Sequence, residues 1–262
     1  MEELYAEYAR REYVSPDPLE FLYRYEAPED REVVGLIASS LAYGRVASIL
    51  ASVGKVLDAL GPSPARMLRE GDMRDVAARL SGFRHRFSGA EETAAFLCGI
   101  GQALREHGSL EELFGHSAPR GAPILEQMDA FARGLLEYAR LPASHLLPCA
   151  SRGSACKRLA LYMRWMVRRD AVDPGGWRCV RPCDIIVPLD THMFRIGRGL
   201  GFCRRATPDA KAALEITAGF RALRLDDPVR YDFALTRFGI RSGMSVDDLL
   251  RRFAERAADA ER

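Results

Sequence analysis

The segment "GSACKRLALYMRWMVRR", residues 153–169, joins a turn of small residues to a long apolar run. Within the run, Leu159, Tyr162 and Met166 recur at the spacing of one helical face, and Trp165 lies on another face. A helix that is apolar on most of its faces belongs inside a domain. We therefore expect this segment to form a buried helix at the centre of the fold.

Lys157 stands at the start of this helix, four residues after Gly153. The chain has 38 lysine and arginine residues, and only three of them are lysines, at positions 55, 157 and 211. The turn before the helix presents free backbone N–H groups, which suit a phosphate. On position alone Lys157 is an ordinary first-turn lysine, whereas its rarity favours a chemical role that arginine cannot fill.

The overall composition is that of a globular protein. The 262 residues are 48% hydrophobic and 28% charged, which is enough for one large domain or two lobes. The first residues, "MEELYAEYARREY", are charged from the second position, and no apolar run reaches the ~20 residues that span a bilayer. We expect a cytoplasmic protein with no membrane partner.

Six cysteines stand at positions 98, 149, 156, 179, 183 and 203. Their spacing is neither the paired pattern of a zinc site nor the compact run of an iron–sulfur site. Thiols of cytosolic proteins are usually reduced. We expect small buried thiols, no metal site and no cofactor.

The net charge is only +2, but it is unevenly distributed. Residues 150–205 contain twelve basic and four acidic side chains, so this stretch carries +8 and the remainder of the chain carries −6. A localised basic block suits an anionic surface such as the phosphates of DNA. Solvated helix faces explain the same pattern, so the charge alone favours neither interpretation.

Nearly every segment has the pattern of a helix with identifiable ends, marked by proline, glycine or a capping residue. The expected helices begin at Pro28, cover Val46–Leu60 up to Gly61, cover about 91–106 and 124–138, begin at Thr207-Pro208, and begin at the capping box of Ser245–Asp248. The only strand-like run, residues 184–189, contains Pro188 and is interpreted as a buried connector. The predicted fold class is all-α, with two helical lobes.

The stretch "PLDTHMFRIGRGLGF", residues 188–202, is the second motif that stands out. Asp190 follows an apolar run and precedes a helix that carries Met193 and Ile196. This position predicts that Asp190 is the N-cap of that helix. From there the carboxylate can also face a nearby pocket.

Residues 187–201, "VPLDTHMFRIGRGLG", resemble the loop and helix of the helix-hairpin-helix DNA glycosylases, the superfamily of endonuclease III and the 8-oxoguanine glycosylases. In that superfamily a glycine-rich hairpin precedes a lysine and a buried helix, and Gly153 and Lys157 have the spacing of its lyase-competent members. Residues 32–68 resemble its opening helices, and residues 226–240 resemble its late helix beside the base pocket.

Two departures from the superfamily pattern leave the base specificity open. The hairpin lacks the usual Leu-Pro-Gly-x-Gly sequence, because Ser151 and Arg152 precede Gly153, and Ala155 takes the place of the second glycine. Residues 168–184 also look inserted relative to endonuclease III. The lengthened connection is most similar to the archaeal 8-oxoguanine glycosylase branch, and it also fits an uncharacterised bacterial family within the superfamily.

The resemblance implies an architecture of two lobes with the active-site cleft between them. Residues 28–149 would form a lobe like the six-helix barrel of the superfamily. Residues 1–27 and 150–262 would form the second lobe, which carries the hairpin at about 151–169 and the aspartate loop at 184–202.

The resemblance also implies an activity, namely base-excision repair by a monomeric, nucleoid-associated DNA glycosylase with AP-lyase activity. The substrate would be damaged double-stranded DNA, with the oxidised purine 8-oxoguanine as the leading candidate base. Lys157 would attack the sugar and form a Schiff base, and Asp190 would stabilise the cationic sugar and help to deprotonate the amine. Two alternatives remain open: a monofunctional glycosylase for another lesion, and a non-catalytic DNA-binding protein of the same fold.

Further residues receive roles from the same resemblance. The expected DNA contacts are Arg152, Gly153, Ser154, Ala155, Arg158, Arg195 and Arg198. The candidates for the base pocket or for the wedge that replaces the extruded base are Tyr43, Arg45, Trp177 and His192. Tyr43 fits the protein core equally well, and His192 also fits a plain hydrogen-bonding role in the first turn of its helix.

Overall fold

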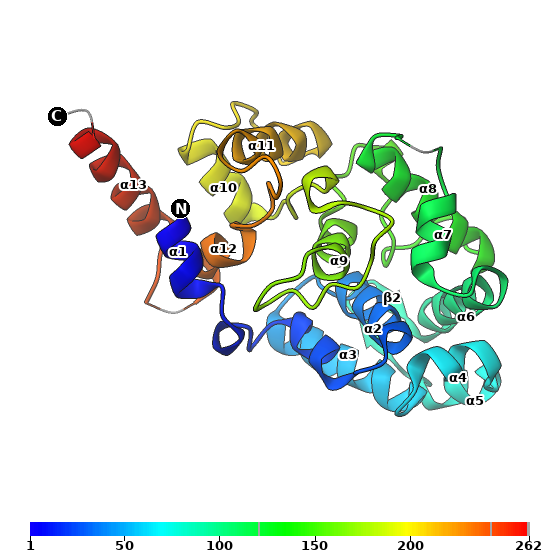
Figure 1. The fold of residues 1–262 in the computed structure, drawn as a ribbon. Helices are drawn as coiled ribbons and strands as arrows, with labels where there is room; N and C mark the ends of the chain where they lie inside the picture. Colours follow the sequence, from blue (N-terminus) through cyan, green and yellow to red (C-terminus); the bar gives the residue numbers. More distant parts are fainter. Residues whose placement is uncertain (120, 242, 261–262) are drawn as a thin grey trace.

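The computed structural model describes residues 1–119, 121–241 and 243–260, which are mostly helical (Figure 1). The α-helices are α1 (Glu2–Tyr8), α2 (Pro28–Ser40), α3 (Val46–Leu60), α4 (Pro64–Glu70), α5 (Met73–Arg79), α6 (Ala90–His107), α7 (Leu110–His116), α8 (Ile124–Tyr138), α9 (Lys157–Val167), α10 (Thr191–Gly199), α11 (Ala210–Leu223), α12 (Asp232–Ile240) and α13 (Val246–Ala260). Short 3-10 turns are η1 (Arg11–Tyr13), η2 (Pro18–Arg24), η3 (Ala150–Arg152) and η4 (Pro182–Asp184). The predicted all-α fold class is therefore confirmed, because the described residues are mostly helical.

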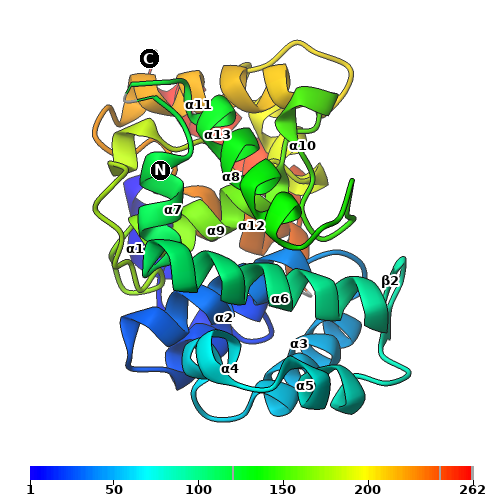
Figure 2. The same cartoon turned by 90° about the vertical axis from the view of Figure 1, so that its right-hand side faces the viewer.

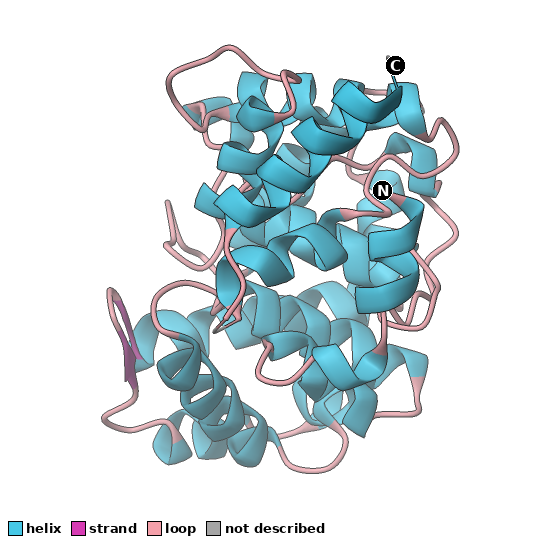
Figure 3. Cartoon of the chain, turned by 90° about the vertical axis from the view of Figure 1, so that its left-hand side faces the viewer, coloured by secondary structure: helices cyan, strands magenta, loops and turns pink. Residues whose placement is uncertain are grey.

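A two-stranded hairpin, which was not predicted, is the exception to the helical fold. Its strands β1 (Arg84–His85) and β2 (Ser88–Gly89) pair antiparallel, with Arg84 opposite Gly89. The strands lie at the edge of the molecule (Figure 3).

Helix α9 lies in the middle of the molecule, as its sequence predicted (Figures 1 and 2). Trp165 and Tyr162 are completely buried on it, and Met163 is almost so. The helix packs against α2, whose residues from Glu32 to Ser40 are themselves buried. Helices α2 to α8 make most of their contacts with one another, whereas α10 packs on α11, α12 and α13. The N-terminal α1 packs on α12, so the two ends of the chain lie in the same region.

Most helix boundaries follow the local signals in the sequence. Helix α3 ends at Gly61, whose φ of 77° lies in the left-handed region. Helix α13 begins with the predicted capping box, since Ser245 Oγ accepts a hydrogen bond from Asp248 N at 3.1 Å. The prediction that Thr207-Pro208 begins a helix was wrong. Asp209 caps α11 instead, because its carboxylate accepts from Ala212 N at 2.9 Å.

The run at residues 184–189 is a buried connector without regular strand structure, as predicted. Val187 N donates to Thr217 Oγ1 at 3.1 Å, so a side chain of α11 satisfies this backbone group. The connector delivers the chain to Asp190 at the start of α10.

A network of charged side chains lies at the other end of α9. Arg164 Nε is 3.1 Å from Asp173 Oδ1, and Arg164 Nη1 is 2.5 Å from Asp232 Oδ2. Arg168 also pairs with Asp173, and its Nε is 2.9 Å from Asp227 Oδ1. Burial raises the pKa of Asp173 to about 6 although both arginines lower it. These charges are tolerated in the interior because they are paired.

None of the single helices in the described part of the chain is both long and apolar enough to cross a membrane. Among the helix pairs of the described residues, only α3 and α4 together reach the required length and composition, and they are bent by 54° relative to each other.

Candidate functional site

Asp190 occupies the N-cap of α10, as predicted. Its Oδ1 accepts a hydrogen bond from Met193 N at 2.8 Å. Its second oxygen, Oδ2, lies 3.6 Å from Lys157 Nζ. The cap therefore fixes the carboxylate through one oxygen and leaves the other oxygen for the lysine.

Lys157 is the first residue of α9, and the turn before it sets its position. Gly153 and Cys156 both adopt left-handed backbone conformations, with φ of 80° and 47°. Cys156 N donates to Ser154 Oγ at 3.1 Å, which closes the turn locally. The Lys157 side chain is 37% exposed and that of Asp190 is 16% exposed, so the pair remains accessible to a ligand.

The Lys157–Asp190 pair lines a cavity of about 760 Å³. Segments far apart in the sequence build its wall. The polar lining residues are Asp17, Tyr43, Ser154, Lys157, Arg158, Arg164, Asp190, Thr191, His192, Asp232, Thr236 and Arg237. The apolar lining residues include Val46, Ile49, Leu161, Leu189 and Ile240.

Tyr43 lies at the rim of this cavity and is anchored to the hairpin. Its hydroxyl is 3.1 Å from the His85 carbonyl oxygen and 3.1 Å from Ser88 Oγ. The guanidinium of Arg158 lies over the Tyr43 ring, 4.7 Å from its centroid. Arg45 is exposed at the start of α3 and does not line the cavity.

The predicted DNA-contacting arginines have different environments. Arg158 is half-buried, donates from Nη1 to the Ser40 carbonyl at 2.8 Å, and has a pKa lowered by burial. Arg195 and Arg198 are exposed on α10, and Arg195 forms an ion pair with Asp247. The side chain of Arg152 lies outside the described residues. Gly153 is exposed, Ser154 is half-buried and Ala155 is buried, so the turn offers only part of its length to a partner.

His192 lines the cavity and packs closely on α12. A Cβ atom at Gly239 would overlap the His192 ring, so this contact requires glycine. The structure thus brings His192 together with Lys157, Asp190 and Tyr43 around one cavity.

Trp177 does not reach this cavity, and its expected position as an exposed stacking platform needs correction. The residue is 6% exposed, and its ring centroid lies 5.1 Å from that of Tyr162. Its indole Nε1 donates to Glu32 Oε2 at 3.1 Å. Burial raises the pKa of Glu32 to about 7, although this hydrogen bond and those from the backbone of Glu111 and Leu110 lower it. Trp177 belongs to the core because both its ring and its polar atom find partners there.

Two features of the site were missed by the sequence reasoning. Asp232 and Arg237, both on α12, line the cavity, although neither was singled out within the segment 226–240. Burial raises the pKa of Asp232, as does the charge of nearby Asp190, whereas Arg164 lowers it. The sequence signal that could have identified Asp232 is its position as an acidic residue inside an apolar run.

The second missed feature is the tip of the hairpin beside Tyr43. Phe87 is 66% exposed, with Arg86 5.6 Å from its ring centroid and the His145 ring 5.1 Å away. The Arg86 side chain also touches the space beside Gly44, which lines the cavity. Single exposed apolar side chains are common on protein surfaces, so Phe87 is of interest because of its place beside the cavity.

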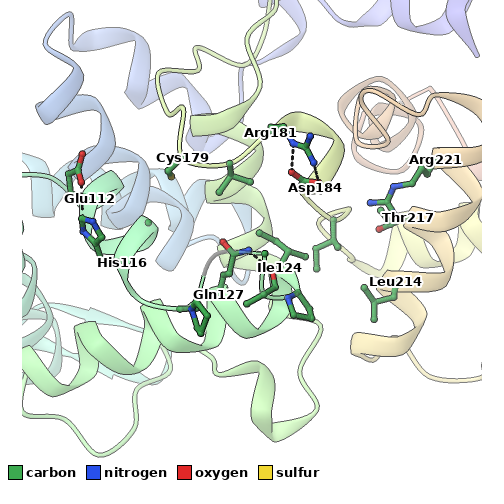
Figure 4. A pocket seen from close by; sticks show the side chains of 18 residues that line it. Glu112, His116, Ile124, Gln127, Cys179, Arg181, Asp184, Leu214, Thr217 and Arg221 are labelled. Carbon is green, nitrogen blue, oxygen red and sulfur yellow. Dashed lines mark hydrogen bonds and ion pairs between the residues drawn. The ribbon is translucent and has the colours of Figure 1, made fainter.

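A second cavity, of about 820 Å³, lies between α8, α11 and the segment 179–186 (Figure 4). It shares no lining residue with the Lys157 cavity. Arg181 pairs with Asp184 at 2.8 Å and His116 with Glu112 at 3.7 Å, and Arg221 donates from Nη2 to the Cys183 carbonyl at 2.9 Å. This cavity therefore offers fewer free groups for chemistry, despite its size.

Within the described part of the chain, no group of three or more His, Cys, Asp or Glu side chains could hold a metal ion. Cys98, Cys156, Cys179, Cys183 and Cys203 are free thiols. Cys156 is the one beside Lys157, and burial raises the pKa of its thiol to about 11. At neutral pH this thiol is protonated and is a poor nucleophile.

Fold and site together define a helical protein with a lysine–carboxylate pair in the wall of a cavity. Residues 17–241 match the model of a protein family described as "Protein of unknown function (DUF2400)", and the chain belongs to that family. The match includes Lys157, Asp190 and every residue of the cavity wall except Pro16. No curated protein and no solved structure matches the chain.

Proposed function

We propose that the chain is a DNA glycosylase with associated AP-lyase activity, which removes a damaged base, with 8-oxoguanine as the first candidate, from double-stranded DNA. The observation that carries the proposal is the 3.6 Å contact between Lys157 Nζ and Asp190 Oδ2 in the wall of the cavity. A base inside a duplex is out of reach of an enzyme until it is extruded into a pocket. The cavity volume of about 760 Å³ is within the usual range for sites that bind small molecules.

The chemistry begins with the transfer of a proton from the Lys157 ammonium, with Asp190 as its first acceptor. The neutral amine then attacks C1′ of the sugar, the N-glycosidic bond breaks, and the base leaves with the bonding electrons and takes up the proton that Asp190 accepted, which restores the Asp190 carboxylate. Asp190 stabilises the positive charge that develops on the sugar. Ring opening gives a Schiff base between Nζ and C1′, and loss of a 2′ proton expels the 3′ phosphate.

This chemistry explains the rare lysine. A guanidinium stays protonated at any physiological pH, so arginine cannot supply the attacking amine. The hydrogen bond from Met193 N holds Asp190 in place, which keeps its second oxygen beside Lys157. Both groups are thus positioned by the first turns of α9 and α10.

The DNA would bind across the mouth of the cavity. In this proposal η3, the turn at Gly153 and α9 form the helix-hairpin-helix element, and their free amides bind a phosphate together with the exposed Arg195 and Arg198. The cavity is the cleft between a lobe of residues 28–149 and a lobe of residues 1–27 and 150–262. Phe87 at the hairpin tip, anchored through Tyr43, would fill the space that the extruded base leaves in the duplex.

Reductive trapping tests the proposal. Borohydride should link the wild-type chain covalently to a duplex that contains 8-oxoguanine and to one that contains an abasic site. Lys157→Ala should reduce the adduct by about 1,000-fold, because the nucleophile is lost. Lys55→Ala and Lys211→Ala are matched controls, since both lysines are exposed and lie outside the cavity. A Lys157→Ala variant that is trapped as efficiently as the wild-type chain would contradict the proposal.

A second candidate function is a monofunctional glycosylase, and one observation favours it. Lys157 is engaged in an ion pair with Asp190, and an ammonium in such a pair is not a nucleophile. Such an enzyme would release a base without a trapped adduct, and it would lose activity in Asp190→Asn but keep it in Lys157→Ala. A non-catalytic DNA-binding protein would instead bind duplexes with strong salt dependence and release no base.

A further inference from the structure

Helix α12 contributes two buried polar atoms that have no hydrogen-bond partner among the described residues, Asp232 Oδ1 and Arg237 Nε. Both side chains line the cavity that contains Lys157 and Asp190. Each residue is only 3% exposed. A buried polar atom without a partner lowers stability by about 1–3 kcal/mol, so two of them beside one cavity require an explanation.

The other polar atoms of these two side chains are already engaged. Asp232 Oδ2 pairs with Arg164 Nη1 at 2.5 Å. Arg237 donates from Nη1 to the Tyr13 carbonyl at 3.3 Å and from Nη2 to Asp17 Oδ2 at 3.2 Å. Each side chain is therefore fixed by its neighbours and has one polar atom left for a ligand.

The surroundings suit a flat ring. Leu161, Leu189 and Ile240 line the same cavity and provide apolar surface for the faces of a base. The charge of Asp190 acts on Asp232, which places the two carboxylates within electrostatic reach of each other. A ligand at Asp232 and Arg237 thus lies near the reacting pair.

We propose, on the basis of the function proposed above, that Asp232 and Arg237 read the edge of the extruded base and select a guanine-type edge. Such an edge has two adjacent N–H donors, N1–H and N2–H, next to the carbonyl O6. Asp232 Oδ1 accepts from the two donors, and Arg237 Nε donates to O6. An adenine-type edge places a lone pair at N1, which faces the carboxylate unfavourably.

A pair of lesions with the same oxidised C8 position isolates the edge. Base release is measured from two duplexes of one sequence, with 8-oxoguanine in the first and 8-oxoadenine in the second. The wild-type chain should release 8-oxoguanine roughly 100-fold faster. Asp232→Asn should lose roughly 10- to 100-fold of the 8-oxoguanine rate and most of the preference, because an amide N–H₂ then meets the donors. Equal wild-type rates, or an unchanged preference in the variant, overturn the inference.

Arg237→Lys provides a second variant that keeps a positive charge beside Asp17 but lacks Nε, and it should lose the preference in the same way. Asp173→Asn is the matched control, because it alters the same arginine network without lining the cavity. This variant should keep the preference. If it loses the preference as Asp232→Asn does, the network acts structurally and the inference is wrong.

Trapping on an abasic duplex separates this inference from the proposed function, since an abasic site has no base to read. Asp232→Asn should lose at least about tenfold more of its 8-oxoguanine release than of its trapping on the abasic duplex, as expected for a residue that contacts the base. Equal losses of release and trapping contradict the inference. A wild-type chain that traps neither duplex contradicts the proposed function itself, and the inference with it. A wild-type chain that traps the abasic duplex but releases both bases equally contradicts the inference alone.

Discussion

Helix α9 carries two kinds of ion pair. At its first residue, Lys157 makes a single 3.6 Å contact with Asp190, and both side chains are partly exposed. Two turns later, Arg164 contacts Asp173 and Asp232 at 3.1 and 2.5 Å, and all three side chains are at most 3% exposed.

On the proposed function, this difference separates structural charge from reactive charge within one helix. Arginine stays protonated and binds carboxylates through several N–H groups, so the buried pairs are permanent. Lysine is a single point charge whose proton can be lost, and its partner is held by a separate hydrogen bond from Met193 N. A loosely held lysine beside a fixed carboxylate suits proton transfer, whereas the arginine network suits the stability of the fold.

Arg164→Met should give the largest effect on stability, because it leaves two buried carboxylates without this partner. We expect a loss of about 3–5 kcal/mol in the free energy of unfolding, the usual result of breaking a buried ion pair. Urea unfolding followed by circular dichroism measures the loss. Arg198→Met is the matched control on an exposed surface and should change the value by less than about 0.5 kcal/mol. If Arg164→Met lowered the free energy of unfolding only slightly, the distinction between the buried and the partly exposed ion pairs would be removed.

Asp190→Asn should abolish most of the activity while the helix keeps its cap. Asparagine is as good an N-cap as aspartate, so the free energy of unfolding should change by less than about 0.5 kcal/mol. Loss of the charge should slow base release by roughly 100-fold, the scale of removing one electrostatic group from a reacting centre. Asp190→Ala should lose in addition about 1 kcal/mol of stability with the cap. An Asn variant with wild-type rates would show that Asp190 serves only α10.

The sequence predicts the features that depend on neighbours along the chain. The ends of α3, α10 and α13 were foreseen because Gly61, Asp190 and Ser245 act within their own turns. The start of α11 was not, because Thr207-Pro208 and Asp209 give competing signals only two residues apart.

Features that depend on distant residues were not predictable in the same way. Trp177 is buried against a distant part of the chain. Its hydrogen-bond partner Glu32 lies 145 residues earlier, so the sequence around Trp177 does not reveal this contact. Asp232 meets Arg164 across 68 residues, so no local pattern marks it as part of the cavity wall. The approach of Lys157 to Asp190 was expected only through a resemblance to a known superfamily, and its distance required the structure.

Glu32→Gln extends the comparison to a buried acid whose hydrogen-bond donors, Glu111 N and Trp177 Nε1, are neutral. Burial raises the pKa of this carboxyl from 4.5 to about 7, so between these pH values the folded chain binds a proton that the unfolded chain has lost. Wild-type stability therefore falls as the pH rises from about 4.5 to about 7.

The Gln variant lacks this titration and should be more stable than the wild type by about 3 kcal/mol at pH 8, with no gain at pH 4. Urea unfolding at the two pH values tests this difference. An equal effect at both values would show that the ionisation of Glu32 has no part in the change.

Lys157→Met should have as small an effect on stability as Asp190→Asn. A partly exposed ion pair contributes little, typically below about 1 kcal/mol. A positive charge in the first turn of α9 also opposes the helix dipole, by about 0.3–1 kcal/mol. The two terms nearly cancel, so the free energy of unfolding should stay within about 0.5 kcal/mol of the wild-type value. An unchanged or slightly higher stability, together with the loss of trapping, would show that Lys157 is present for chemistry and not for the fold. If the free energy of unfolding fell by about 2 kcal/mol or more, Lys157 would instead stabilise the fold as Arg164 does. Its rarity would then have a structural reason.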